Sequence, residues 1–169
     1  MQVLGVAGWS GSGKTTLLTR LIPRLVESGL QVAAIKHAHH NFDIDQPGKD
    51  SFQHRMAGAR EVLVSSANRW ALMHENRGEA EASLAELIDK LSPADIVLVE
   101  GFKHETHDKI EVHRAANGKP LLCTGDTSVI ALATDLPATP VSIPILPLDD
   151  IAAIADFVLR RCGFAGRAA

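Results

Sequence analysis

A glycine-rich loop near the N-terminus constrains this chain more than any other feature. Residues 8–15 read Gly-Trp-Ser-Gly-Ser-Gly-Lys-Thr, which matches the phosphate-binding pattern G-x-x-x-x-G-K-[ST]. An apolar run over 3–7 precedes the loop and predicts a strand, and leucines at helical spacing follow it. Strand, glycine-rich loop and helix in this order form the setting in which such a loop binds nucleotide phosphates.

Each part of this loop has an expected role toward a nucleoside triphosphate. The glycines allow tight turns that direct backbone N–H groups at phosphate oxygens. Lys14 is expected to reach the β- and γ-phosphates, and the Thr15 hydroxyl to ligate Mg²⁺. A dinucleotide fingerprint fails, because Thr16 stands where its third glycine would be. The nucleotide-binding residues predicted here are Gly11, Ser12, Gly13, Lys14, Thr15 and Thr16.

Length and composition are typical of one globular domain. The chain has 169 residues, of which 46% are hydrophobic and 22% charged, enough for one sizeable core. The net charge is −3 without a basic run, so no nucleic-acid partner is expected. No uncharged apolar stretch reaches membrane-spanning length, so no membrane association is expected either. We therefore expect a single nucleotide-binding domain over 1–169.

Strand and helix patterns alternate along the chain. Helices are expected at four places: 14–28, a short helix capped by Asp50 or Ser51 and ending near Gly58, 79–91, and a C-terminal segment capped by Asp149 or Asp150. An interior proline costs about 3 kcal/mol, so Pro23 predicts a kink or an early end in the first helix. Further strands are expected at 31–36, 96–99, 121–123, 129–133 and 143–146. The alternation predicts an α/β, three-layer P-loop NTPase fold, with helices on both faces of a mostly parallel sheet.

A polar, histidine-rich segment around 37–50 interrupts this pattern. Pro47-Gly48 breaks it, which indicates an exposed arm. The arm carries Phe42 and Ile44, which an isolated loop has little reason to hold, so contact with another molecule is expected. Beyond the arm, residues 61–74 predict a hairpin or two adjacent edge strands.

Histidine and cysteine could indicate a metal site. His37, His39 and His40 include the ligand spacing His-x-His. No cysteine lies near them, so contacts with phosphate or a partner are favoured over zinc. Cys123 and Cys162 lie far apart in apolar segments and are expected to be buried, reduced thiols.

Glu100 is the predicted metal-side acid. A P-loop protein needs a carboxylate at the tip of a buried strand beside the loop, to hold Mg²⁺ directly or through water. The run 96–99 ends in Glu100, and Gly101 would let the backbone pass close to the γ-phosphate. The alternative is a strand-end carboxylate that faces solvent. We assign Lys14 and Glu100 as candidate catalytic residues, and Thr15 and Glu100 as candidate metal ligands.

Asp135 is the candidate for reading the base. A carboxylate can accept from both N1–H and N2–H₂ of guanine, which adenine cannot present together. Asp135 follows the late strand 129–133, at the edge where ligands of open α/β sheets collect. The Asn-Lys pair that usually precedes such an aspartate is missing. The alternative is that Asp135 caps a turn before Pro137.

The chain resembles the MobB family of GTP-binding proteins, molybdopterin-guanine dinucleotide biosynthesis protein B. Besides the P-loop, the resemblance rests on Lys-His-Ala-His-His-Asn-Phe-Asp-Ile-Asp-Gln-Pro-Gly-Lys-Asp-Ser over 36–51 and Val-Glu-Gly-Phe-Lys over 99–103. Arg-Trp-Ala-Leu-Met over 69–73 and Val-Ile-Ala-Leu-Ala-Thr-Asp over 129–135 add to it. These motifs extend over almost the whole chain, and the first two are far more specific than the P-loop.

This resemblance implies a cytoplasmic, dimeric protein that binds GTP with Mg²⁺ and hydrolyses it weakly. It also implies an adaptor role in molybdenum-cofactor maturation, where GMP is attached to molybdopterin. The partners implied are a second copy of the chain, the guanylyltransferase that performs the transfer, and molybdopterin-carrying proteins.

Two other functions remain open at this point. One is a small-molecule kinase, because residues 7–16 also look like the loop of uridine-kinase-type enzymes. Such kinases place a catalytic aspartate after the second strand and carry an arginine-rich lid, whereas here Lys36-His37 follows that strand. The other is a binding module that uses GTP as a switch, since no general base or arginine finger is evident.

Overall fold

The computed structural model describes residues 1–38, 42–137 and 140–166. The chain divides into two compact units, Met1–His37 with Leu84–Ala169, and Ala38–Ser83, and each is described by itself. The arm expected around 37–50 begins at the first boundary, and residues 61–74 lie within the second unit. A single nucleotide-binding domain over 1–169 stays a prediction.

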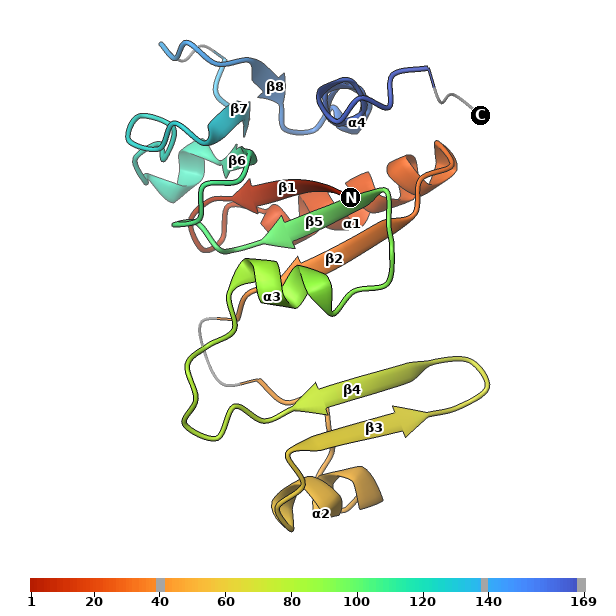
Figure 1. Ribbon diagram of the computed structural model, residues 1–169. Coiled ribbons are helices and arrows are strands. Elements are labelled where there is room, and N and C mark those ends of the chain that lie inside the picture. Colours follow the sequence, from red (N-terminus) through yellow and green to blue (C-terminus); the bar gives the residue numbers. More distant parts are fainter. Residues whose placement is uncertain (39–41, 138–139, 167–169) are drawn as a thin grey trace. The chain divides into compact units, whose positions relative to one another are not determined.

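The first unit is built on a six-stranded sheet in the order β2-β5-β1-β6-β7-β8 (Figure 1). Every neighbouring pair is parallel. The strands are β1 (Gln2–Ala7), β2 (Val32–Lys36), β5 (Ile96–Glu100), β6 (Lys109–His113), β7 (Val129–Thr134) and β8 (Ile145–Pro147). In register, Val6 of β1 lies opposite Glu100 of β5. The end of β5 therefore reaches the same sheet edge as the loop that follows β1.

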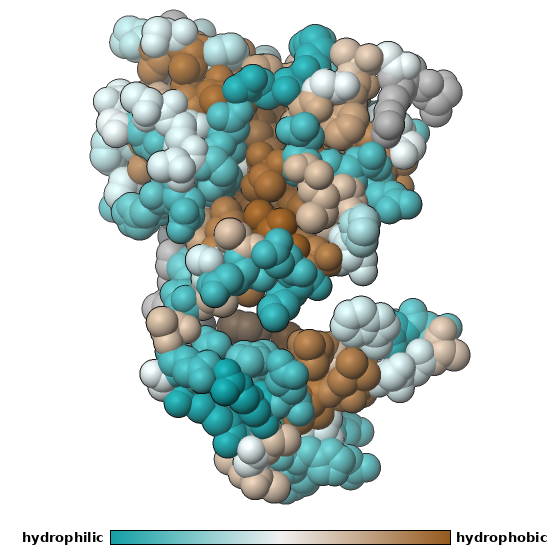
Figure 2. Space-filling model, viewed as in Figure 1, coloured by the Kyte–Doolittle hydropathy of each residue, from teal (hydrophilic) through white to brown (hydrophobic). Residues whose placement is uncertain are grey.

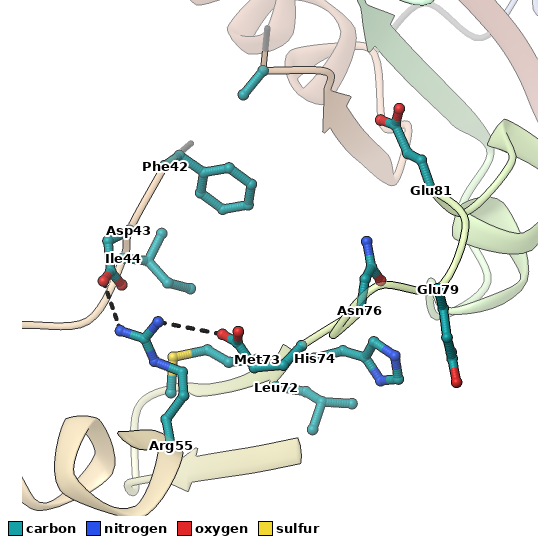
Figure 3. A pocket seen from close by; sticks show the side chains of 12 residues that line it. Phe42, Asp43, Ile44, Arg55, Leu72, Met73, His74, Asn76, Glu79 and Glu81 are labelled. Atoms are coloured by element: carbon teal, nitrogen blue, oxygen red, sulfur yellow. Dashed lines mark hydrogen bonds and ion pairs between the residues drawn. The ribbon is translucent and has the colours of Figure 1, made fainter. Parts of the chain in front are cut away.

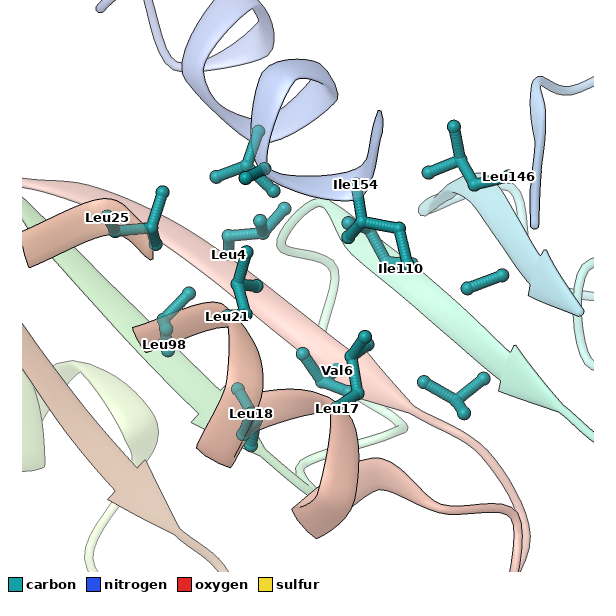
Figure 4. Packing of buried hydrophobic residues seen from close by; sticks show 14 of the residues in the cluster. Leu4, Val6, Leu17, Leu18, Leu21, Leu25, Leu98, Ile110, Leu146 and Ile154 are labelled. Atoms are coloured by element: carbon teal, nitrogen blue, oxygen red, sulfur yellow. The ribbon is translucent and has the colours of Figure 1, made fainter. Parts of the chain in front are cut away.

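Helices cover both faces of this sheet, and the predicted α/β fold is confirmed. Side chains of α1 (Lys14–Glu27) and α4 (Ile151–Arg161) form one core with alternate residues of the strands. Figure 4 shows them converging: Leu4, Val6, Leu17, Leu21, Leu25 and Ile154. On the other face, Leu84 and Ile88 of α3 (Leu84–Asp89) pack against Val97 and Val99 of β5.

The helix expected over 14–28 is present as α1, but the early end that Pro23 could cause does not occur. The helix continues through Pro23 to Glu27, because its buried leucines lie on one side throughout. Asp150 caps α4 by accepting a hydrogen bond from the Ala153 N–H. The helix expected over 79–91 was too long, since it spans only Leu84–Asp89. Glu79 instead closes a turn onto the Asn76 carbonyl and pairs with Arg60.

Strand β6 was not anticipated, and the strand expected over 121–123 is absent from the described structure. Both errors have the same cause. Lys109 and Glu111 of β6 are fully buried, a pattern unlike that of an apolar core strand. The Glu111 carboxylate accepts from the backbone N–H groups of Leu122 (2.8 Å) and Cys123 (2.9 Å). These N–H groups therefore satisfy a buried charge instead of pairing in a sheet.

The connection from β5 to β6 crosses β1 through residues 101–108. A Cβ placed on Gly5 would lie 2.4 Å from Nε2 of His107 and 2.8 Å from Cγ of Lys109. The crossing segment therefore packs directly on β1, and only glycine fits beneath it. A short 3₁₀ helix, η1 (Ala115–Asn117), follows β6. No helix within the described residues is long and apolar enough to cross a membrane.

The second unit combines a short helix with a hairpin. Helix α2 (Asp50–Met56) precedes β3 (Glu61–Ser65) and β4 (Trp70–His74), which pair antiparallel. One hairpin face carries Val62, which is buried, while the opposite face exposes Leu63, Leu72 and Trp70. Figure 2 shows hydrophobic residues at the surface over this hairpin.

Candidate functional site

The loop between β1 and α1 has the conformation that phosphate binding requires. Gly8, Gly11 and Gly13 have φ values of 145°, 77° and 96°, which L side chains rarely adopt. Gly13 is the residue immediately before α1. The backbone N–H groups of the first helical turn therefore open onto the loop.

Lys14 folds back over this loop. Its ammonium donates to the carbonyls of Gly8 (2.8 Å) and Trp9 (3.0 Å). Burial is the largest cause that lowers the pKa of Lys14; Glu100 opposes the shift, and the nearby cations Lys36 and Lys103 add to it. A phosphate anion at the loop would stabilise the ammonium form, so the site is electrostatically prepared for an anion.

Thr15 and Glu100 meet at the edge where β1 and β5 end. The Thr15 hydroxyl donates to Oε1 of Glu100 over 3.0 Å, and Nζ of Lys36 lies 3.5 Å from the same oxygen. Only 13% of the Glu100 side chain is exposed, so it is not the solvent-facing strand end of the alternative interpretation. A Cβ on Gly101 would lie 2.8 Å from Cβ of His37, so glycine is needed where the chain leaves β5.

The Thr15 hydroxyl and the Glu100 carboxylate suit a magnesium ion that takes its other ligands from phosphate and water. They are too few for a metal that is bound by protein groups alone. Mg²⁺ prefers oxygen and is usually bound through one or two protein groups, with phosphate and water completing its shell. A hydroxyl and a carboxylate 3.0 Å apart supply such a pair. Within the described residues, no cluster of three or more His, Cys, Asp or Glu side chains could hold a metal.

Ser12 and Thr16 differ in their surroundings. Ser12 is buried, and its hydroxyl has no hydrogen-bond partner among the residues the structure describes. That oxygen lies 2.7 Å from the position of a Cβ on Gly8. Thr16 is exposed on the first turn of α1, where its carbonyl accepts from the Thr19 hydroxyl.

Asp135 lies at the end of β7, where it binds the segment after β6. Oδ1 accepts from the Ala115 N–H (2.8 Å), and Oδ2 lies 3.9 Å from Nη1 of Arg114. One carboxylate oxygen thus has a backbone partner, and the other faces a cation across a longer distance. A role in base recognition stays a prediction.

Two residues after β6 approach the phosphate loop and were missed from the sequence. Nε of Arg114 lies 3.3 Å from the position of a Cβ on Gly13, and the Asn117 amide donates to the Ser10 carbonyl (3.4 Å). No sequence pattern pointed to these two residues, because β6, the strand that precedes them, was not recognised. An arginine beside the loop is a candidate for stabilising phosphate charge.

In the second unit, Arg55 joins the arm to the hairpin. Its guanidinium pairs with Asp43 (2.6 Å), Glu75 (3.2 Å) and Asp45 (3.7 Å). Figure 3 shows Arg55 reaching Asp43 beside a cavity of about 1310 Å³, into which Phe42 and Ile44 also point. The Asp45 N–H is the largest cause that lowers the pKa of Asp43, and Arg55 adds to it. His39 and His40 lie outside the described residues, so the zinc alternative stays untested there.

Comparison with known proteins bears on the kinase alternative and on the family resemblance. A uridine kinase of Leuconostoc citreum (strain KM20) is 28% identical over 109 residues, which cover 59% of this chain and 51% of that enzyme. This likeness is partial, and it agrees with the shared loop noted from the sequence.

A much closer likeness covers nearly the whole chain. The molybdopterin-guanine dinucleotide biosynthesis adapter protein of Escherichia coli (strain K12) is 45% identical over 163 residues, 95% of this chain and 93% of that protein. The crystal structure of a molybdopterin-guanine biosynthesis protein B matches with a TM-score of 0.77 at 29% identity, over 95% of this chain and 99% of that one. The family model for molybdopterin guanine dinucleotide synthesis protein B matches residues 3–135. The chain therefore belongs to the MobB family.

Proposed function

We propose that this chain is a GTP-binding adaptor in the biosynthesis of molybdopterin guanine dinucleotide, where it assists the guanylyltransferase. The observation that carries the nucleotide part is the contact of Thr15 with Glu100 over 3.0 Å, beside a glycine loop in phosphate-binding conformation. The adaptor role is supported by family membership and by the similarity to adapter proteins of this pathway.

Each loop residue then has a specific task toward GTP and Mg²⁺. Lys14 moves its hydrogen bonds from the Gly8 and Trp9 carbonyls to phosphate oxygens. Thr15 and Glu100 would hold the ion, which would supply positive charge next to the phosphates. We propose slow intrinsic hydrolysis, as the family resemblance implies, with Lys14 and Glu100 as its catalytic residues.

We also propose that two copies associate through the hairpin. Leu63, Leu72 and Trp70 share one face of the β3–β4 hairpin, and their exposed fractions are 60%, 45% and 62%, respectively. Adjacent exposed apolar side chains on one face mark an interaction surface. We place such a dimer in the cytoplasm, as the family resemblance implies, and the absence of a disulfide between Cys123 and Cys162 agrees with that location.

GTP turnover with and without the guanylyltransferase tests this function. The assay separates three products: free phosphate, a phosphorylated acceptor, and guanylylated molybdopterin made by the partner. We expect slow phosphate release alone, and faster guanylylation when this chain and GTP are both present. The Lys14→Ala variant should lose GTP binding and the stimulation together while it stays folded. Phosphate transfer to a nucleoside would instead establish the kinase alternative.

A further inference from the structure

A second cavity lies beside the phosphate loop, and apart from Trp9 its lining is separate from the residues proposed to bind GTP. It measures about 630 Å³, within the range of pockets that hold small organic ligands. One wall is the segment that crosses from β5 to β6, with Lys103, His104 and Thr106; the other is the loop before β7, with Thr127 and Ser128. Trp9, the second residue of the phosphate loop, contributes the aromatic surface.

The walls of this cavity are held by buried polar contacts. The buried Lys109 ammonium donates to Asp126 (3.0 Å) and to the Ser128 hydroxyl beneath the loop before β7. Glu111 holds the same loop nearer its start, through the backbone N–H groups of Leu122 and Cys123. Both ends of the loop are therefore tied to β6, which fixes this wall of the cavity.

The indole ring of Trp9 is held in place and carries two cations. Its N–H donates to the Pro120 carbonyl over 2.8 Å. Nζ of Lys103 lies 5.4 Å, and Nζ of Lys119 5.9 Å, from the ring centroid, the range of cation–π attraction. Across the described part of the chain, neither lysine has an ion-pair partner. Trp9 and Lys103 line the cavity, and Lys119, which does not line it, lies at the same indole ring.

Two of the three cavity carboxylates are already paired with cations of the protein. Asp108 pairs with Arg161 over 2.6 Å, and Asp126 pairs with Lys109 over 3.0 Å. Burial acts to raise the pKa of the Asp126 carboxyl. Hydrogen bonds from Ser128 and Lys109 nevertheless hold this pKa below its usual value. Glu105 is the lining carboxylate that has no cationic partner in the described ranges. Against this one carboxylate stand the two lysines at Trp9, so a net positive charge remains there for an anionic ligand.

We propose that this cavity binds a small phosphorylated heteroaromatic molecule, with its ring in the cavity next to Trp9 and its phosphate on Lys103 and Lys119. The lining favours a polar ring, because hydroxyls and carboxylates outnumber its apolar side chains. A pterin ring, which has both N–H donors and a carbonyl acceptor, matches that lining. This inference rests on the proposed function, since it makes the cavity the binding site for the pterin phosphate that is guanylylated.

The position of Trp9 also places the two ligands next to each other. The Trp9 carbonyl accepts from Lys14, while its side chain lines the cavity. A ligand on the indole ring would therefore contact a residue of the phosphate loop itself. Such a chain would hold GTP and the acceptor of its GMP side by side for the partner enzyme.

Isothermal titration calorimetry with 6-hydroxymethylpterin phosphate tests the proposal. The chain is first saturated with Mg²⁺ and a non-hydrolysable GTP analogue, so that the phosphate loop cannot bind the probe. We expect one site per chain, with affinity at least about tenfold above that of unphosphorylated 6-hydroxymethylpterin and of inorganic phosphate, since contacts to charged groups are worth about that much.

Variants with matched charge changes complete the test. Lys103→Gln combined with Lys119→Gln should weaken pterin phosphate binding by about tenfold or more. Lys90→Gln, at an exposed lysine after α3, should leave it unchanged. Equal affinity for the phosphorylated and unphosphorylated pterin, or an unchanged double variant, would overturn the proposal. Heat from the GTP analogue in the same samples reports nucleotide binding separately, so failure of the proposed function is seen independently.

Discussion

Gly8→Ala is the substitution that tests most sharply how the phosphate loop is held. A Cβ at this position would lie 2.4 Å from the Val112 carbonyl oxygen of β6 and 2.7 Å from Oγ of Ser12. The residue also has a φ of 145°, which is almost restricted to glycine. The carbonyl belongs to a buried strand and cannot move aside as a flexible side chain would. Conformational strain and steric overlap therefore act together.

The expected cost follows from these two contributions. Backbone strain contributes about 1–3 kcal/mol, and overpacking against a fixed group adds about 1–3 kcal/mol. We expect the free energy of unfolding to fall by about 2–6 kcal/mol in total. Gly29→Ala is the matched control: its φ is 79° and no atom lies within 4 Å of the added Cβ. That control should lose only about 1–2 kcal/mol.

Urea unfolding of both variants measures the difference. With a slope of about 2 kcal/mol per molar urea, the Gly8→Ala midpoint should fall by roughly 1–3 M and the control midpoint by under about 1 M. GTP affinity should fall only in Gly8→Ala, because the loop must shift to accept the methyl group. Equal midpoints for the two variants would refute the claim that contact with β6 fixes the loop.

Three further predictions address the base, the dimer and the thiol. Asp135→Asn should weaken GTP binding by roughly 2–4 kcal/mol and improve xanthosine triphosphate binding, as competition binding measures; an unchanged order of affinities would assign base recognition elsewhere. Leu72→Glu should shift the chain to monomer in sedimentation analysis, because it places a charge on the exposed hairpin face, and wild-type association would exclude that face. Burial and the nearby Glu111 raise the pKa of Cys123 to about 11. Since the thiolate is the reactive form, alkylation of Cys123 at pH 8 should be slow and should accelerate up to about pH 11; a plateau near pH 9 would contradict this.

Local patterns predicted the centre of the site because the chemistry there is local in sequence. The P-loop carries its own strand, turn and helix signals, and the apolar run 96–99 identified the buried strand that ends at Glu100. Two such signals at strand ends suffice, because the ends of parallel strands meet at one sheet edge. Their meeting is visible in the hydrogen bond from Thr15.

The remaining errors arise where distant contacts override local pattern. Lys109 and Glu111 make β6 look like an exposed segment. Each nevertheless has hydrogen-bond partners within residues 122–128, which no local pattern reveals. Arg114 was missed for the same reason, since it gains its position only because β6 lies beside β1. Helix α3 begins late because Glu79 is used in a turn and an ion pair. Each case depends on tertiary contacts, which hydrophobic periodicity does not encode.

Magnesium dependence of GTP binding, compared between the wild-type chain and Glu100→Gln, tests the central claim most directly. The amide keeps the shape of Glu100 and an oxygen for the Thr15 hydroxyl, but it removes the charge that would hold the ion. We expect Mg²⁺ to strengthen GTP binding by the wild type, and this gain to shrink by about 10–100-fold in the variant. Affinity without Mg²⁺ should stay the same, because the loop amides and Lys14 are intact. An equal gain from Mg²⁺ in both proteins would contradict the assignment of Glu100 to the metal.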